Sequence, residues 1–199
     1  MDTSTIGDRM DIARDRTALL VMDYQKGVVA MLGDKAAPFI ERTAALIAAA
    51  RAASVRVIYV VVGFRPGFPE ISPRNQGFST IKQSGRFDDP SVSDVIDAVR
   101  PTDHEPTVTK RRVGPFGGTD LEVILRSQGI ETLVLAGIST SGVVLSTVRH
   151  ASDADYRLII ASDCCADTDQ EVHTVLMTKV FPRQATVTTS DELIATLRA

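Results

Sequence analysis

The sequence predicts an α/β protein with a three-layer, doubly wound (Rossmann-like) fold, in which helices cover both faces of a mostly parallel sheet of about six strands. Apolar runs of strand length alternate along the chain with stretches whose apolar residues recur at helical spacing. Two runs, residues 57–62 and 133–136, are continuously apolar, which is typical of parallel strands that are buried on both faces. The 199 residues suit one domain with a large core, so we expect a single domain over residues 1–199.

The first half of the chain supplies two strands, one helix and one long irregular segment. A polar arm over residues 1–16 precedes an apolar strand at residues 17–22, and a helix with an apolar inner face follows over residues 35–53. The second strand, residues 55–62, ends at the run GFRPGFP, which breaks regular structure. Residues 63–90 therefore form an excursion that is too long for a simple connection, and such loops usually act as lids or binding loops.

The second half continues the alternation of strands and helices. The expected strands cover residues 107–109, 133–136, 157–161 and 185–188. The expected helices cover residues 91–99, 119–127, 143–151, 170–181 and 191–197. Helices between successive strands predict parallel strand pairing with right-handed crossovers.

Charge and composition exclude several classes of protein. The net charge is −3 and no basic run persists, so we expect no nucleic-acid partner and no membrane partner. No apolar stretch is long enough to span a membrane, and residues 1–16 are charged, unlike a signal peptide, which predicts a soluble, cytoplasmic protein. Cys164 and Cys165 are adjacent and are not expected to pair, which fits a reducing compartment. We expect no cofactor.

The stretch over residues 133–151 joins a buried strand to a helix and organises the predicted site. The strand stops at Gly137, and Ser139, Thr140 and Ser141 precede the first helical turn, where they are placed to cap free N–H groups. The helix then begins at the carboxyl edge of the sheet. Open α/β proteins bind ligands at this edge, and a helix N-terminus there favours anions and carbonyl oxygens.

This stretch resembles a motif of the isochorismatase-like cysteine hydrolases, G-x-x-T-x-x-C-V-x-x-T-x-x-x-A. The residues that match the motif are Gly137, Thr140, Val144, Thr147 and Ala151. The position of the nucleophilic cysteine holds Val143, whose side chain neither attacks a carbonyl nor takes up a proton. True isochorismatases carry glycine there and cleave a vinyl ether, and a shift of one residue would put Gly142 at that point instead.

The resemblance extends over residues 18 to about 193 and includes the other two members of the family's catalytic triad. Asp23 in D-x-Q matches the family's aspartate, and Lys110, followed by Phe116, matches its lysine. The resemblance implies that Asp23 and Lys110 are catalytic and that Gln25 and Phe116 contact substrate. We expect the Asp23 carboxylate and the Lys110 ammonium group within about 4 Å of each other. The alternative is that Asp23 caps a helix and Lys110 forms a structural ion pair.

The resemblance also predicts the conformation of the loop after the fourth strand. Relatives have a non-proline cis peptide bond that turns backbone N–H groups toward the substrate carbonyl, and the matching bond here joins Ile138 to Ser139. With Gly142, this loop is the expected oxyanion site. An ordinary trans loop is the alternative.

The excursion supplies the expected substrate-binding side chains. Arg65, Arg112 and Asn75 are candidates for a substrate carboxylate, because the fork of an arginine matches that geometry. The candidate walls of an apolar pocket are Phe64, Phe68, Phe78 and Phe116. For each of these residues the alternative is that it only holds the loop in place.

No other residue replaces the missing thiol convincingly. Thr140 and Ser141 have no histidine beside them in the sequence, and Cys164 and Cys165 are expected to be small buried side chains. The three histidines lie on a loop and two helices, where surface or packing roles are expected: His104, His150 and His173. Metal-binding relatives carry a D-x-H segment and a further histidine after the second strand, where this chain reads GFRPGFPE, so we expect no metal.

Three hypotheses about function follow. The first is an isochorismatase-like hydrolase of a small carboxylated metabolite that uses an Asp/Lys acid–base pair without a cysteine nucleophile. The second is a catalytically silent member that binds a metabolite or a protein partner in the same crevice. The third is an amidohydrolase with a relocated cysteine. Because relatives commonly assemble, we also expect a homo-oligomer.

Overall fold

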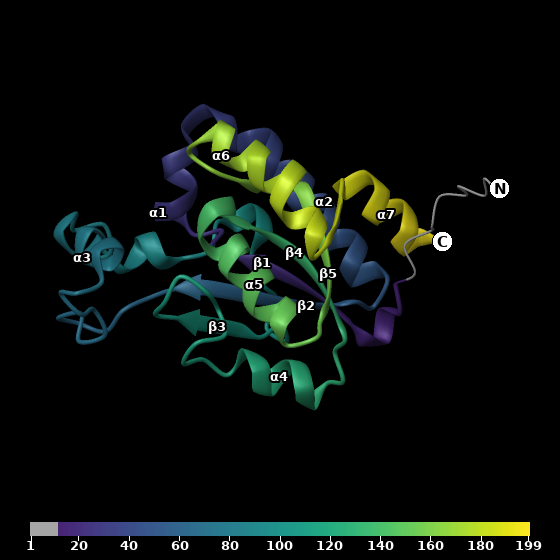
Figure 1. The fold of residues 1–199 in the computed structure, drawn as a ribbon, viewed down its shortest axis with the longest axis horizontal. Helices are drawn as coiled ribbons and strands as arrows, with labels where there is room; N and C mark the ends of the chain where they lie inside the picture. Colours follow the sequence, from purple (N-terminus) through teal and green to yellow (C-terminus); the bar gives the residue numbers. More distant parts are fainter. Residues whose placement is uncertain (1–11) are drawn as a thin grey trace.

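The computed structural model describes residues 12–199, and its centre is a six-stranded sheet in which all neighbouring strands are parallel (Figure 1). The strand order is β3-β2-β1-β4-β5-β6. The strands are β1 Thr17–Met22, β2 Arg56–Val62, β3 Thr107–Lys110, β4 Thr132–Ile138, β5 Arg157–Ala166 and β6 Thr186–Thr188. All six strands lie where the sequence predicts them. The first eleven residues of the predicted polar arm, residues 1–16, lie outside the described part of the chain.

Helices cover both faces of the sheet, as the doubly wound prediction requires. The α-helices are α1 Lys26–Val29, α2 Ala36–Ala52, α3 Gln76–Gln83, α4 Leu121–Ser127, α5 Leu145–Asp153, α6 Gln170–Val175 and α7 Ser190–Arg198. On one face α2 packs with α7, and α4 and α5 cover the other face (Figure 1). Within residues 12–199 no helix is long and apolar enough to cross a membrane.

Strand β1 shows how the sheet separates two cores. Leu19 and Val21 pack into the core beneath α2 and α7. Leu20 and Met22, which point to the opposite face, pack into the core beneath α4 and α5. Both sets are buried, which explains why the predicted strand is apolar at every position from Ala18 to Met22.

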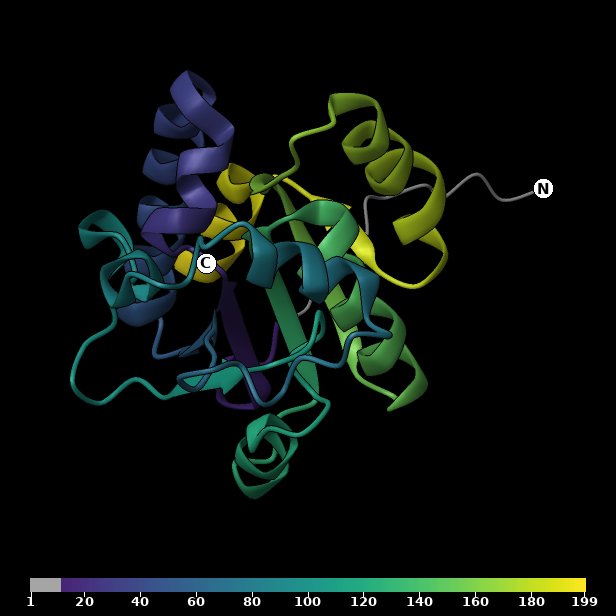
Figure 2. The ribbon, with the colours of Figure 1, turned by 90° about the vertical axis from the view of Figure 1, so that its left-hand side faces the viewer.

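The excursion over residues 63–90 differs from the expectation, because it contains the helix α3. The side chain of Asn75 accepts a hydrogen bond from the backbone N–H of Phe78 (3.1 Å) and caps the start of α3. Phe78 is buried against Phe64, so the helix is held to the rest of the excursion by aromatic contacts. The excursion passes in front of the carboxyl ends of the strands (Figure 2).

The helix predicted over residues 91–99 is wrong. Two short 3-10 turns, Pro90–Ser93 and Asp97–Val99, lie on either side of Val95. Val95 forms an antiparallel bridge with Gln25, and this pairing requires an extended backbone that ends helical structure. A long-range contact with the segment after β1 therefore overrides the local helical preference of residues 91–99.

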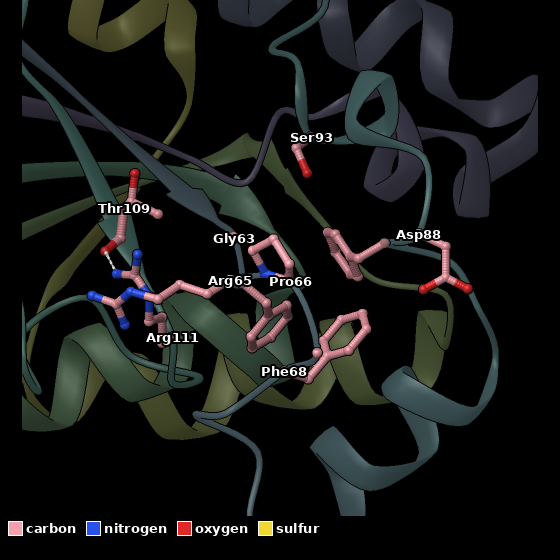
Figure 3. A pocket seen from close by; sticks show the side chains of 11 residues that line it. Gly63, Arg65, Pro66, Phe68, Asp88, Ser93, Thr109 and Arg111 are labelled. Atoms are coloured by element: carbon pink, nitrogen blue, oxygen red, sulfur yellow. Dashed lines mark hydrogen bonds between the residues drawn. The ribbon is translucent and has the colours of Figure 1, made fainter.

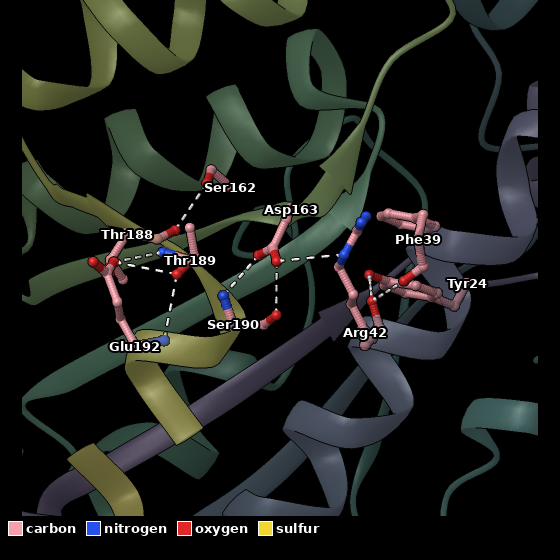
Figure 4. Close-up of polar contacts among 10 residues, drawn as sticks. Tyr24, Phe39, Arg42, Ser162, Asp163, Thr188, Thr189, Ser190 and Glu192 are labelled. Carbon is pink, nitrogen blue, oxygen red and sulfur yellow. Dashed lines mark hydrogen bonds and ion pairs between the residues drawn. The ribbon is translucent and has the colours of Figure 1, made fainter. Parts of the chain in front are cut away.

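Strand β5 continues beyond the predicted residue 161, and its added part is tied to α7 (Figure 4). The carboxylate of Asp163 accepts hydrogen bonds from the backbone N–H and the hydroxyl of Ser190, both at 2.7 Å. Thr189 and Glu192 complete a capping box at the start of α7. These contacts fix the beginning of α7 against the sheet.

Candidate active site

Asp23 and Lys110 meet at the carboxyl edge of the sheet, on the ends of two strands that are not neighbours. The Nζ atom of Lys110 lies 2.9 Å from Oδ2 of Asp23, inside the expected 4 Å. Strand β2 lies between them and sets the alignment, because Val62 is in register with Lys110 and the backbone N–H of Asp23 donates to the carbonyl of Val60 (2.8 Å). Asp23 is 6% exposed and Lys110 is 3% exposed, so the pair is almost excluded from water.

The environment of Asp23 favours the protonated carboxyl. Burial raises the pKa of Asp23 from 3.8 to about 6, although the neighbouring ammonium group of Lys110 acts in the opposite direction. The second carboxyl oxygen, Oδ1, is buried and has no hydrogen-bond partner among the described residues. A carboxyl group in this state is suited to exchange a proton with a bound molecule near neutral pH.

The loop after β4 lies directly beside this pair. Met22, the residue before Asp23, is in register with Gly137, and the peptide bond between Ile138 and Ser139 is cis. A π-helical turn, Thr140–Val144, follows and leads into α5. The backbone N–H groups of Gly142 and Val144 donate to the carbonyl of Ser139 at 3.1 and 3.3 Å, so the turn closes on itself. The sequence predicts the helix here but not the π-helical turn at its start.

Gly142 and Val143, the two residues that can align with the family's nucleophilic cysteine, differ in their surroundings. Val143 is 2% exposed and packs in the same core as Met22 and Phe116. A Cβ atom at Gly142 would come within 2.6 Å of the Ser139 hydroxyl oxygen, so a side chain at that position requires Ser139 to rotate away. Val143 thus lies in the apolar core, whereas Gly142 lies against the side chain of Ser139.

A histidine stands beside this loop, contrary to the expectation for Thr140. The hydroxyl oxygen of Thr140 lies 2.8 Å from Nδ1 of His173, which α6 carries. The carboxylate of Asp167 accepts hydrogen bonds from the backbone N–H and the hydroxyl of Ser141, both at 2.7 Å. Burial lowers the pKa of His173 despite the opposing charge of Asp167, so the neutral ring predominates at pH 7. These contacts hold the loop from the side of β5 and α6.

Gln25 and Phe116, both expected to contact substrate, lie in structural surroundings. The side-chain amide of Gln25 is fully buried and donates to the carbonyls of Val62 (2.8 Å) and Ser93 (2.9 Å). Its oxygen accepts the backbone N–H of Val62 at 2.8 Å. Phe116 is buried and stacks on His150, with ring centroids 4.3 Å apart. In this structure both side chains support the site rather than face an open cavity.

The excursion forms a pocket of about 490 Å³ next to the ends of β2 and β3 (Figure 3). Its wall is aromatic, because Phe64 packs against Phe68 and Phe87 with ring centroids 5.8 and 5.6 Å apart. Arg65 and Arg111 reach its opposite end. The full lining is Gly63, Phe64, Arg65, Pro66, Gly67, Phe68, Phe87, Asp88, Ser93, Thr109 and Arg111.

The structure changes the set of side chains that are available for a substrate carboxylate. Arg65 lines the pocket, but Asn75 caps α3 and Arg112 donates to the backbone carbonyl of Glu70 (3.2 Å). Arg111, which is not among the residues predicted to bind substrate, lines the pocket in place of Arg112. The direction of a side chain beyond the end of a strand depends on how the backbone turns there, and the sequence pattern does not supply that.

Neither cysteine is suited to act as a nucleophile. Cys164 and Cys165 are both buried in β5. Burial raises the pKa of Cys164 to about 12 and that of Cys165 further still, so both remain thiols at neutral pH. In the described part of the chain, no group of three or more His, Cys, Asp or Glu side chains is arranged to hold a metal ion.

Comparisons with known proteins agree with this architecture. The family profile for the isochorismatase domain matches residues 17–192. The chain is similar to YecD of Escherichia coli O157:H7, an uncharacterized isochorismatase family protein, with 33% identity over 198 residues that cover 94% of this chain and 100% of that protein. It is also similar to the ureidoacrylate amidohydrolase RutB of Methylorubrum extorquens, with 30% identity over 171 residues that cover 75% of this chain and 69% of the enzyme. Among solved structures, a cysteine hydrolase from Pseudomonas syringae pv. phaseolicola superposes with a TM-score of 0.85, at 27% identity over 94% of each chain.

Proposed function

The chain belongs to the isochorismatase family of hydrolases, and from that premise we propose that it hydrolyses a small carboxylated molecule with Asp23 and Lys110 as an acid–base pair and without a cysteine nucleophile. The observation that carries this proposal is the state of Asp23. Its pKa is raised to about 6, one of its oxygens lacks a partner among the described residues, and the residue aligned with the family's nucleophile is Val143. Proton transfer is available at this site, whereas covalent attack is not.

In the proposed reaction the protonated carboxyl of Asp23 donates its proton to the bound substrate. The ammonium group of Lys110, 2.9 Å away, stabilises the carboxylate that remains. Water attacks the activated carbon of the substrate, and its surplus proton returns to Asp23, which restores the starting state. True isochorismatases cleave a vinyl ether. Among the candidate substrates, this type needs the fewest catalytic groups in addition to a proton donor.

The aromatic pocket is the proposed place for the body of the substrate. Three phenylalanines provide an apolar wall, and Arg65 and Arg111 provide positive charge at the opposite end. This combination favours an anion with an apolar body, and a carboxylate matches the fork of an arginine. The proposal therefore names carboxylated vinyl ethers as the first substrates to test, and carboxylated amides and esters as the next.

The test is a hydrolysis screen of vinyl ethers, amides and small esters, each with a carboxylate group, against purified protein. Asp23→Asn is expected to abolish hydrolysis, because the variant has no proton to donate. Asp94→Asn is the matched control, since it removes an exposed carboxylate whose ion-pair partner among residues 12–199 is Lys26 on the surface. Turnover that survives Asp23→Asn would contradict the proposed role.

A catalytically silent, ligand-binding protein is the second candidate, and the burial of Asp23 and Lys110 favours it. A silent protein would bind carboxylated ligands in the pocket and show no turnover in the screen. An amidohydrolase with a relocated cysteine is the third candidate, and it requires a thiol adduct on Cys164 or Cys165. The high pKa values of both thiols argue against that adduct.

We further propose that the protein is a cytoplasmic homo-oligomer. The two free cysteines fit a reducing compartment, and the excursion over residues 63–90 is long enough to reach a second copy. Sedimentation analysis at micromolar concentration is expected to show an oligomer, and a monomer would contradict the proposal.

A further inference from the structure

Glu70, a residue of the excursion, holds two arginines at the charged end of the aromatic pocket. Its Oε1 atom lies 2.5 Å from Nη1 of Arg65 and 2.9 Å from Nε of Arg111. The Glu70 side chain is only 11% exposed, although the loop that carries it lies outside the sheet. Two guanidinium groups therefore converge on a single carboxylate oxygen beside a pocket whose wall is apolar.

The positive charge around Glu70 exceeds what one carboxylate neutralises. Arg112 also approaches this segment and donates to the backbone carbonyl of Glu70 at 3.2 Å. Arg65 and Arg111 thus place two positive charges against one carboxylate, and Arg112 adds a third guanidinium group at the backbone of the same residue. Asp88, which lines the pocket, forms no ion pair with any described residue. An anion that enters the pocket meets a net positive end.

We propose that Arg65 and Arg111 form a carboxylate-binding site that Glu70 occupies in the free protein and that the carboxylate of a ligand takes over on binding. This inference rests on the proposed function, because it assigns the charged end of the proposed substrate pocket. The aromatic wall and the volume of about 490 Å³ favour a monocarboxylate with an aryl-sized body. Glu70 then acts as an internal competitor, which lowers affinity for every carboxylate by the same factor.

A purely structural role for Glu70 makes the opposite prediction about binding. If Glu70 only holds the loop in shape, its removal loosens both arginines and weakens the binding of carboxylates. If Glu70 occupies the ligand's place, its removal frees two preformed donors and strengthens binding. The sign of the change therefore separates the two roles.

The experiment is calorimetric titration of the full-length protein with phenylacetate, which has an aromatic body and one carboxylate. Glu70→Gln is expected to tighten binding about tenfold, because one charge-assisted competitor is lost. Arg111→Gln is expected to weaken binding about tenfold. Glu131→Gln is the matched control, since it breaks an ion pair with Arg16 (2.9 Å) far from the pocket and is expected to leave binding unchanged.

Three results would overturn the inference. The first is weaker or unchanged binding of phenylacetate by a Glu70→Gln protein that melts at the same temperature as the wild type. The second is that no variant binds phenylacetate detectably. The third is that the neutral analogue phenylacetamide binds as tightly as phenylacetate. Glu70→Ala repeats the test without an amide that could still hold the arginines. Because titration needs no turnover, the inference and the proposed hydrolysis fail separately: loss of turnover in Asp23→Asn tests the reaction, and the Glu70 variants test the pocket.

Discussion

The buried carboxyl group of Asp23 makes the free energy of unfolding depend on pH, and one substitution isolates the effect. Its pKa is about 6 in the folded protein and takes its ordinary value of 3.8 in the unfolded chain, so folding favours the protonated form. The stability that this preference contributes is complete below pH 3.8 and is lost as pH rises from 3.8 through 6. The difference of about 2 pKa units corresponds to about 3 kcal/mol, of which about 2 kcal/mol is lost between about pH 4 and about pH 7.

Asp23→Asn removes this titration and leaves Lys110 in place, so the comparison of the two proteins cancels most other groups. Urea unfolding followed by far-UV circular dichroism, at intervals from about pH 4 to about pH 7, gives the free energy of unfolding of each protein. The wild-type value minus the value for the Asp23→Asn protein is expected to fall by about 2 kcal/mol across this range. A difference that is constant, or that rises with pH, would refute the raised pKa and the reasoning built on it.

Three further predictions concern the same edge of the sheet. Lys110→Gln is expected to raise the pKa of Asp23 above its present value, because the ammonium group that lowers it is gone, and the fall of kcat/KM with rising pH would move to higher pH. An unmoved profile would mean that Lys110 does not tune the acid. Val143→Cys is expected to react with iodoacetamide faster than the parent, because a helix N-terminus activates a thiol, and a rate equal to that of a free thiol would place residue 143 outside the crevice. Gln25→Leu is expected to cost about 3 kcal/mol in urea unfolding, because it leaves the buried N–H and carbonyl of Val62 without partners, and a loss below about 1 kcal/mol would contradict that role.

The central strands were predictable because each contains a short apolar run with a clear end. Residues 17–22 match β1 to the residue, since both faces of this central strand are buried and no polar position interrupts it after Thr17. The helix over residues 91–99 was predicted wrongly, because Val95 pairs with Gln25, which is distant in the sequence. Helix α3 was missed because it has only two large apolar side chains, Phe78 and Ile81, which are too few to establish a helical period.

The candidate site was predictable to the extent that it depends on strand ends. Asp23 and Lys110 lie at the ends of parallel strands, whose carboxyl ends share one edge of the sheet, and their contact at 2.9 Å follows from that. The contact between His173 and Thr140 depends on how α6 folds back after β5. The choice of Arg111 over Arg112 depends on a turn of the backbone after β3. Such details arise from tertiary packing and have no local signal in the sequence.

In the proposed mechanism Asp23 supports hydrolysis without a covalent intermediate. The most direct measurement is mass spectrometry of the intact protein during turnover of the best substrate from the screen, before and after treatment with iodoacetamide. After treatment we expect hydrolysis at an undiminished rate and no mass corresponding to an acyl adduct, and we expect loss of turnover in Asp23→Asn. A trapped adduct on Cys164 or Cys165, together with inactivation by iodoacetamide, would contradict this mechanism.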